Sequence, residues 1–219
     1  MNDKLLFIDA ETDGLYGEFI SVGVCVTDAK GKILEEYYIG RDLEQMEITS
    51  DWVKENVVPR LGEYKEFATQ EDLLNEVWDI WQTNKDATVI GDVIFPVECR
   101  LFEETVKLNP EERTFAAPYP LVDVASMLLA KGIDPNISRS ELLGTKESEQ
   151  HNALTDVRWT SRIYQEHILE NKKEIAMDKT VESEGKLPNI NDIVKKTKSE
   201  MPASQDYNNQ ANRDYYAHE

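Results

Sequence analysis

The hydrophobic and polar positions at the start of the chain predict three β-strands. Residues 5–11 begin with a run that is apolar on both faces, which is typical of a strand at the centre of a sheet. Residues 19–27 and 33–39 are rich in β-branched and aromatic side chains, and the segment 28–31 between them is a tight-turn signal. These three strands are therefore expected to form an antiparallel meander.

Helical spacing replaces the strand pattern after a mixed segment at 41–68, which offers only a short helix at 52–57. From Thr69 onwards, apolar residues recur every three or four positions up to Trp81, and this spacing predicts a helix. Strands followed by alternating helices and strands indicate an α/β domain, whose mixed central sheet combines the meander with parallel strands between flanking helices. The remaining elements are expected as a strand at 87–92, a helix at 95–108, a strand at 120–123, and helices at 124–130 and 151–169.

The composition changes after residue 170. Lysine, glutamate and serine dominate first, followed by asparagine, glutamine and tyrosine, so this region has little apolar surface to bury. We therefore expect one domain at 1–170 and a polar tail at 171–219. Within the tail, Ile190, Ile193 and Val194 predict a short amphipathic helix at 189–196 that docks back on the domain.

Cysteine usage and hydropathy indicate the compartment. Cys25 and Cys99 lie in apolar stretches far apart in the sequence, so both are expected to be reduced core residues. No apolar run approaches the roughly 18 residues of a membrane span, and no signal-peptide pattern opens the chain. These features predict a cytoplasmic protein without a membrane partner.

The formal net charge of −19 argues against a protein that follows a long nucleic acid duplex, because such proteins are normally basic. Residues 170–219 are nearly balanced in charge, so the acidity belongs to the domain. An acidic surface can still accept the end of a nucleic acid where bound divalent cations reverse the local charge and few phosphates are held.

Carboxylates follow the predicted strands at positions where apolar residues would be expected. Asp9 and Glu11 close the first strand, and because strand side chains alternate, they project from the same face. Asp92 ends the strand at 87–92, at the carboxyl end where α/β sheets place ligands. His151 stands at the start of the last helix, with Asp156 five residues further on. Buried carboxylates must be compensated, and a divalent metal is the partner that we expect.

Four carboxylates and one imidazole match the needs of phosphodiester hydrolysis. Two cations about 3.5–4 Å apart can activate a water on one side of the phosphodiester and stabilise the leaving oxygen on the other. Hard oxygen ligands suit Mg²⁺ or Mn²⁺. An imidazole titrates near neutral pH, so His151 is suited to take the proton from the attacking water.

The pattern Asp9-x-Glu11, Asp92 and His151-x-x-x-x-Asp156 resembles the DEDDh branch of the DEDD exonucleases over residues 4–169. The resemblance implies a ribonuclease H-like fold and a 3′→5′ exonuclease that releases nucleoside 5′-monophosphates. It implies that two metals are held by the four acids, that His151 is the general base, and that a homodimer is compatible with the family. It also implies that the 3′-terminal nucleotide is contacted by Thr12, Gly14 and Leu15.

Two positions depart from the family pattern. Asp13 stands where many relatives carry a small hydroxyl or apolar residue. The asparagine that often precedes the third acid in relatives is missing before Asp92, and Glu98 is a competitor for that role. Asp92 is preferred, because a strand terminus faces the site whereas Glu98 is expected within a helix and towards solvent.

The function expected from the sequence is a 3′→5′ exonuclease that acts on single-stranded 3′ ends or short oligonucleotides, of RNA or of DNA. Two alternatives stay open: a non-catalytic binding module on the same fold, and an acidic mimic of nucleic acid that occupies a basic partner. Helical spacing favours core packing over base stacking for the four tryptophans, Trp52, Trp78, Trp81 and Trp159.

Overall fold

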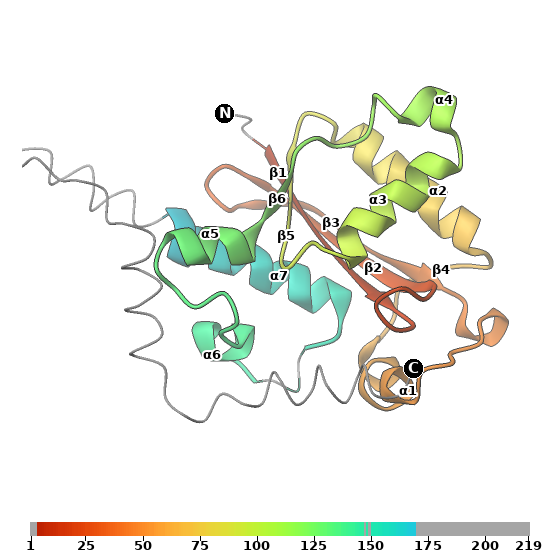
Figure 1. Cartoon of the computed structure of the whole chain (residues 1–219), viewed down its shortest axis with the longest axis horizontal. Helices are drawn as coiled ribbons and strands as arrows, with labels where there is room; N and C mark the ends of the chain where they lie inside the picture. Colours follow the sequence, from red (N-terminus) through yellow and green to blue (C-terminus); the bar gives the residue numbers. More distant parts are fainter. Residues whose placement is uncertain (1–3, 147, 149, 170–219) are drawn as a thin grey trace, which may run out of the picture. The chain divides into compact units, whose positions relative to one another are not determined.

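The predicted strands form one mixed sheet in the computed structural model, which describes residues 4–146, 148 and 150–169 (Figure 1). The order across the sheet is β4-β3-β2-β1-β5-β6, so β1 is a central strand as expected. The strands are β1 (Lys4–Thr12), β2 (Phe19–Asp28), β3 (Ile33–Arg41), β4 (Lys65–Phe67), β5 (Thr88–Gly91) and β6 (Leu121–Asp123). The predicted tail at 171–219 and its helix at 189–196 lie outside the described residues.

The meander and the parallel strands are both confirmed. β1 pairs antiparallel with β2, and β2 pairs antiparallel with β3. β5 runs parallel to β1 and β6 runs parallel to β5. The short strand β4, which the sequence did not indicate, runs parallel to β3 at the other edge. The pairing of β1 with β5 covers only Leu5–Phe7, so the carboxyl end of β1 extends past β5.

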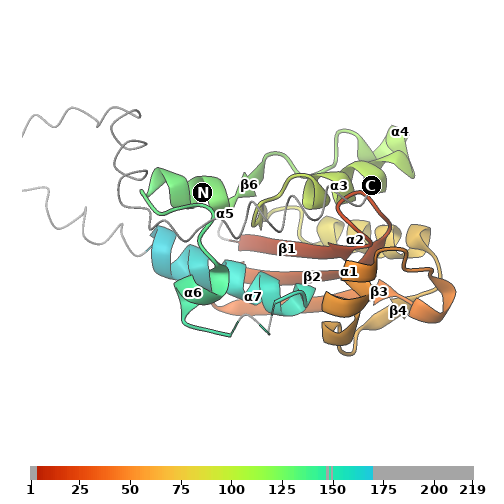
Figure 2. The same ribbon diagram turned by 60° about the horizontal axis from the view of Figure 1, so that its bottom comes forward.

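Helices cover the two faces of the sheet, as the strand alternation requires (Figures 1 and 2). Leu6 and Ile8 of β1 pack against α2 (Gln70–Thr83) and α3 (Val97–Lys107). Leu5 and Phe7 point to the opposite face, which α5, α6 and α7 cover together with the π-helical segment η4. The bounds of these elements are α5 (Val124–Ala130), α6 (Arg139–Leu143), α7 (Ala153–Ile163) and η4 (Tyr164–Leu169).

The mixed segment 41–68 forms a small cap over the carboxyl end of β1. Val53, Val57 and Leu61 pack with Ile20 of β2 in a separate apolar cluster. The short elements of this segment are η1 (Leu43–Gln45), α1 (Asp51–Asn56) and η2 (Val58–Arg60), and the remaining short helix of the described residues is α4 (Pro110–Arg113).

A glycine on β2 brings α7 close to the sheet. Gly23 pairs with Asp9 in the register of β1 and β2. A Cβ at Gly23 would lie 2.2 Å from the backbone oxygen of Ala153, the first residue of α7. The absence of a side chain at this position therefore lets the first turn of α7 contact the strand beside Asp9.

Some predicted details differ from the structure. The last helix starts at Ala153, not at His151, because the Asn152 side chain accepts from Thr155 N and caps the helix there. His151 precedes the cap with a φ of 65°. Cys25 is buried as expected, whereas Cys99 is partly exposed, and both are free thiols. Trp81 and Trp159 are buried and Trp78 packs on the core, but Trp52 is 47% exposed. Among the described residues, no helix has the length and apolarity needed to cross a membrane.

Candidate metal centre

Three of the predicted carboxylates meet at the carboxyl end of β1. Asp9, Glu11 and Asp156 each offer a carboxylate oxygen, and these oxygens lie within 4.8 Å of one another. Strand alternation puts Asp9 and Glu11 on the face that α7 covers. Asp156 is the fourth residue of α7 and reaches the same place because α7 packs on β1 and β2. A group of this size and composition can hold a divalent cation.

The turn before α7 fixes the Asp156 carboxylate. The backbone N–H of His151 donates to Asp156 Oδ2 at 2.9 Å. Asn152, which caps α7, also donates through Nδ2 to the backbone oxygens of Arg60 and Leu61, at 2.9 and 2.8 Å. The start of α7 is therefore tied to the 58–61 segment, and both hold Asp156 beside β1.

Burial and mutual repulsion raise the pKa values of the three carboxyls. The pKa of Asp9 is raised well above its usual range by burial first, and then by the charges of Asp156, Glu98, Glu11 and Asp92. Burial and the charge of Asp156 raise the pKa of Glu11 to about 8, with Arg60 acting in the opposite direction.

Asp156 is subject to the same effects. Burial raises its pKa to about 7, although the backbone N–H groups of His151 and Asn152 lower it, as does Arg60. The whole cluster therefore carries an unfavourable concentration of negative charge when its carboxyls are ionised. A bound divalent cation would relieve it.

Asp92 lies beside this group, but an arginine occupies its carboxylate. It follows β5 at the predicted strand end and contributes to the raised pKa values of Asp9 and Asp156. Arg139 donates to both of its oxygens, through Nη2 to Oδ1 at 2.9 Å and through Nε to Oδ2. The two side chains are each 13% exposed. Arg139 also donates to the backbone oxygens of Pro135 and Ile137, so the pair fixes the chain before α6.

The orientation expected for Glu98 is wrong. Glu98 is the second residue of α3 and is only 4% exposed, so it faces the interior and not the solvent. Its Oε1 accepts a hydrogen bond from the backbone N–H of Ala10, at 3.2 Å, between the two carboxylates of β1. Burial raises the pKa of Glu98 to about 8, and the charges of Glu11 and Asp92 add to the effect. The sequence placed Glu98 in a helix but did not show which face of that helix meets β1.

His151 contacts an exposed tryptophan next to the cluster. The rings of His151 and Trp52 meet edge to face, with centroids 5.2 Å apart and an interplanar angle of 88°. Trp52 belongs to α1, whose N-cap is Ser50. The core position expected for Trp52 is therefore wrong, because α1 holds this side chain at the rim of the carboxylate cluster.

Asp13 holds the start of α1 in place. Its carboxylate accepts from the N–H and the hydroxyl of Thr49, both at 2.7 Å, and from Ser50 N at 2.9 Å. Partial burial acts against these hydrogen bonds, but together they leave the pKa of Asp13 below its usual range. The unusual acid after Glu11 thus links the end of β1 to α1, and this role was not visible in the sequence.

The three residues predicted to contact the terminal nucleotide lie directly after Glu11. Thr12 is buried at the end of β1, Gly14 has a φ of 76°, and Leu15 is partly buried. Arg100 of α3 donates to the backbone oxygen of Gly17 at 2.7 Å and fixes the turn that contains them. This turn therefore follows the cluster residue Glu11 directly in the chain.

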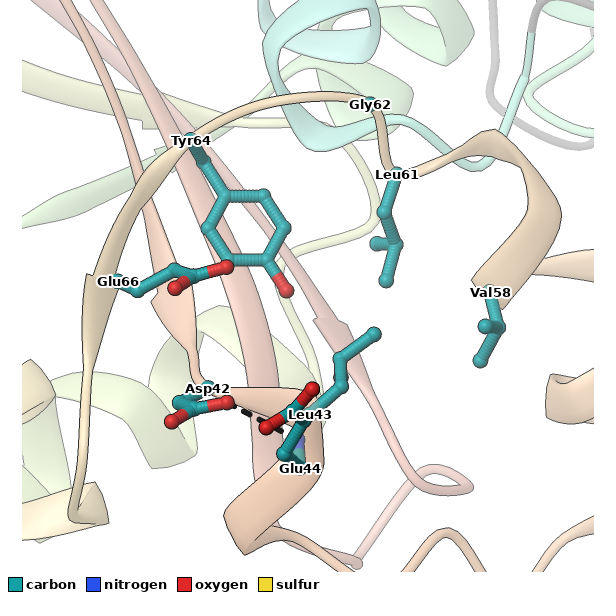
Figure 3. Close-up of a pocket in the computed structure, with 8 residues that line it drawn as sticks. All are labelled: Asp42, Leu43, Glu44, Val58, Leu61, Gly62, Tyr64 and Glu66. Carbon is teal, nitrogen blue, oxygen red and sulfur yellow. Dashed lines mark hydrogen bonds between the residues drawn. The ribbon is translucent and has the colours of Figure 1, made fainter.

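A separate cavity of about 390 Å³ is lined partly by the 58–61 segment (Figure 3). Its acidic residues are already partly engaged, because Asp42 accepts from Glu44 N at 3.0 Å and from the Gln45 side chain. None of the predicted site residues lines it. The lining residues are Asp42, Leu43, Glu44, Val58, Leu61, Gly62, Tyr64 and Glu66.

Solved structures of E. coli exonuclease I have the same fold as this chain. The zinc-bound complex of that enzyme with single-stranded DNA is 13% identical, with a TM-score of 0.59, and the match covers 82% of this chain and 43% of that one. Another exonuclease I structure gives a TM-score of 0.60 at 12% identity, covering 81% of this chain and 43% of that one. The complex of E. coli exonuclease I with a dA16 oligonucleotide gives a TM-score of 0.57 at 12% identity, and the match covers 81% of this chain and 42% of that one.

The chain spans less than half the length of these exonuclease I structures. At this identity the likeness shows the fold, which is the mixed α/β, ribonuclease H-like architecture expected from the sequence. No protein-family model matches the chain. No curated protein matches its sequence either.

Proposed function

We propose that the chain is a metal-dependent 3′→5′ exonuclease that removes nucleoside 5′-monophosphates from single-stranded 3′ ends or short oligonucleotides. The convergence of Asp9, Glu11 and Asp156 carries the proposal, because it builds a compact set of oxygen ligands from distant parts of the chain. The shared fold supports it, since E. coli exonuclease I has been solved with single-stranded DNA and with dA16 and dT13 oligonucleotides.

The donor set fits two hard divalent cations, Mg²⁺ or Mn²⁺. Asp9, Glu11 and Asp156 are assigned as ligands, and Asp92 and Glu98 are the two candidates for the fourth carboxylate. When bound, such cations activate the attacking water and stabilise the leaving 3′ oxygen. Asp9 and Glu11 are held by the central strand β1, and Asp156 is held by the capped start of α7.

His151 is assigned as the general base that accepts the proton of the attacking water. It lies five residues before Asp156, and its own backbone N–H donates to that carboxylate. The contact with the Trp52 ring restricts the orientation of the imidazole. An imidazole is the side chain that most often serves as a general base in enzymes.

The substrate is assigned from the turn after Glu11 and from the charge of the chain. Thr12, Gly14 and Leu15 follow the metal ligands directly and are assigned to the 3′-terminal nucleotide. A net charge of −19 disfavours contacts with many phosphates, so recognition is concentrated at the end of the strand. Arg60 lies close enough to Glu11 and Asp156 to lower their pKa values, so it supplies a basic group where the end of the strand is expected to bind.

Replacing one ligand tests the proposal. Asp9→Ala removes the carboxylate that interacts with every other acid of the cluster. Mg²⁺-dependent release of mononucleotides from a 3′-labelled strand should therefore be abolished. Asp86→Ala provides the control, since this exposed acid lies in a surface ion pair with Lys4. Matched RNA and DNA oligomers, each with a free or blocked 3′ end, would define the sugar and the direction. An Asp9→Ala rate equal to that of the unmodified protein would contradict the assignment.

The net charge favours one competing function, an acidic mimic that occupies a basic nucleic-acid-binding protein. Such a mimic needs no cation and no 3′ end. Salt-sensitive binding to a basic partner, together with the absence of metal-dependent hydrolysis for the unmodified protein, would favour it over the exonuclease.

A further inference from the structure

We propose that Glu98, and not Asp92, supplies the fourth carboxylate of the metal centre. Asp92 instead holds Arg139 and the chain before α6. This inference rests on the proposed function, because it assigns a ligand to the same site. It reverses the sequence-based preference for Asp92 at the strand terminus.

The contacts of Asp92 argue against metal binding. Both of its oxygens accept from the Arg139 guanidinium, and Arg139 is fixed further by the backbone oxygens of Pro135 and Ile137. A paired, 13% exposed carboxylate already has its charge compensated. A cation at Asp92 would also lie near the positive guanidinium, which is unfavourable at short range.

The contacts of Glu98 favour metal binding. Its carboxylate is 4% exposed, and none of the ion pairs among the described residues includes it. The hydrogen bond from Ala10 N uses one acceptor position of Oε1. A carboxylate has about four such positions, so the group retains the capacity to coordinate a cation. One hydrogen bond also compensates little of the cost of a buried negative charge.

The end of β5 explains why Glu98 reaches the site. β5 pairs with β1 only as far as Phe7, so Ala10 lies beyond the last paired residue of that ladder. In place of a further β5 residue, Glu98 in the first turn of α3 accepts the hydrogen bond from the Ala10 N–H. The side chain of Glu98 is thereby fixed between the backbone positions of Asp9 and Glu11.

The charges of the cluster agree with this assignment. With Asp92 neutralised by Arg139, the remaining acids are Asp9, Glu11, Glu98 and Asp156, and Arg60 is a nearby base. Two divalent cations would match the four carboxylate charges. The three acids within 4.8 Å of one another can hold one cation. Glu98 accepts the N–H of Ala10, the residue after Asp9, and we assign the second cation to Glu98 together with Asp9.

Calorimetric titration of the full chain with Mn²⁺ alone tests this inference without relying on turnover. We expect two ions for the unmodified protein. Glu98→Gln keeps an oxygen for the Ala10 N–H but removes the charge, so it should bind one ion normally and the second at least about 100-fold more weakly. Asp92→Asn should keep both ions and lose thermal stability, because Arg139 is left without its charged partner.

The outcomes separate the two proposals. Two ions bound with unchanged affinity by Glu98→Gln would overturn the role of Glu98 and leave the exonuclease proposal intact. Loss of an ion in Asp92→Asn alone would return the fourth position to Asp92. No Mn²⁺ binding by the unmodified protein would overturn both proposals. If Glu98→Gln does not fold, Glu98→Asp keeps the charge with a shorter reach, and unchanged binding of the second ion would then contradict the inference.

Discussion

The convergence of Asp9, Glu11 and Asp156 could be predicted from the sequence because each stands at a regular place in a strongly patterned element. The alternation of β1 puts Asp9 and Glu11 on one face, and the helical pattern of α7 puts Asp156 in its first turn. Glu98 could not be assigned, since the inward face of α3 depends on where β5 ends. Asp92 was expected in the cluster, but its pairing with Arg139, 47 residues away, cannot be read from local pattern.

At the same scale, the role of His151 can be tested by a substitution that its backbone tolerates. His151 has a φ of 65°, a conformation that asparagine adopts more readily than alanine. His151→Asn should lower turnover by roughly two to four orders of magnitude, as expected for a lost general base. Metal affinity should be unchanged, because the backbone N–H that donates to Asp156 remains. A parallel loss of Mn²⁺ affinity in calorimetry would show that His151 acts as a ligand instead.

The raised pKa values predict how stability depends on pH without metal. The folded-state values of about 8 for Glu11 and Glu98 and about 7 for Asp156 exceed the roughly 4 expected in the unfolded chain, and Asp9 is raised as well. Between these limits the folded state binds more protons than the unfolded state, so its stability falls as pH rises from about 4 to about 8. Arg60 acts against this effect at Glu11 and Asp156, whereas the charge of Asp92 adds to the raised pKa values of Asp9 and Asp156.

Thermal unfolding in EDTA between pH 5 and pH 8 measures this dependence. We expect the midpoint to fall as pH increases, and Mg²⁺ to raise it more at pH 8 than at pH 5. For a chain of this size, the unfolding midpoint shifts by about 2–4 °C for each kcal/mol of change in the free energy of unfolding. Asp9→Asn should reduce the fall, since it removes one of the repelling charges. A midpoint that rises steadily over this range without metal would contradict the raised pKa values of the cluster.

At the scale of elements, the site depends on how closely α7 approaches β2. The sequence predicted both elements but gave no reason for the glycine at position 23. The structure gives one, because a Cβ there would lie 2.2 and 2.3 Å from the backbone oxygen and carbon of Ala153. Ala153 and Asp156 belong to the first turn of α7, so a displacement of the Ala153 backbone would also displace Asp156. The insert 41–68 was equally hard to predict, because its short elements are held by contacts such as Asp13 with Thr49 and Ser50.

Gly23→Ala should therefore damage the metal centre as well as stability. Overpacking of this kind costs about 1–3 kcal/mol, and displacement of α7 should weaken Mn²⁺ binding in the same variant. Cys25→Ala is the matched control, because Cys25 is buried on the same strand and face but pairs with Phe7 of β1, not with Asp9. Equal metal affinities in the two variants would mean that Gly23 does not position Asp156.

At the scale of the whole molecule, the pattern of strands and helices was enough to predict a mixed α/β sheet with β1 at its centre. The sheet order confirms this, and the matched part of E. coli exonuclease I has the same fold at 12–13% identity. The edge strand β4 was missed because three residues carry too little periodicity. The proposed function depends on the carboxyl end of β1 meeting the start of α7, where Asp9, Glu11 and Asp156 come together.

Anomalous scattering from crystals of the full chain soaked in Mn²⁺ would test most directly whether Asp9, Glu11 and Asp156 bind a metal together. We expect a strong anomalous peak about 2.0–2.6 Å from carboxylate oxygens of Asp9, Glu11 and Asp156, and no such peak in crystals of Asp9→Ala treated in the same way. A peak bound only by surface carboxylates, or the same peak in Asp9→Ala crystals, would contradict it.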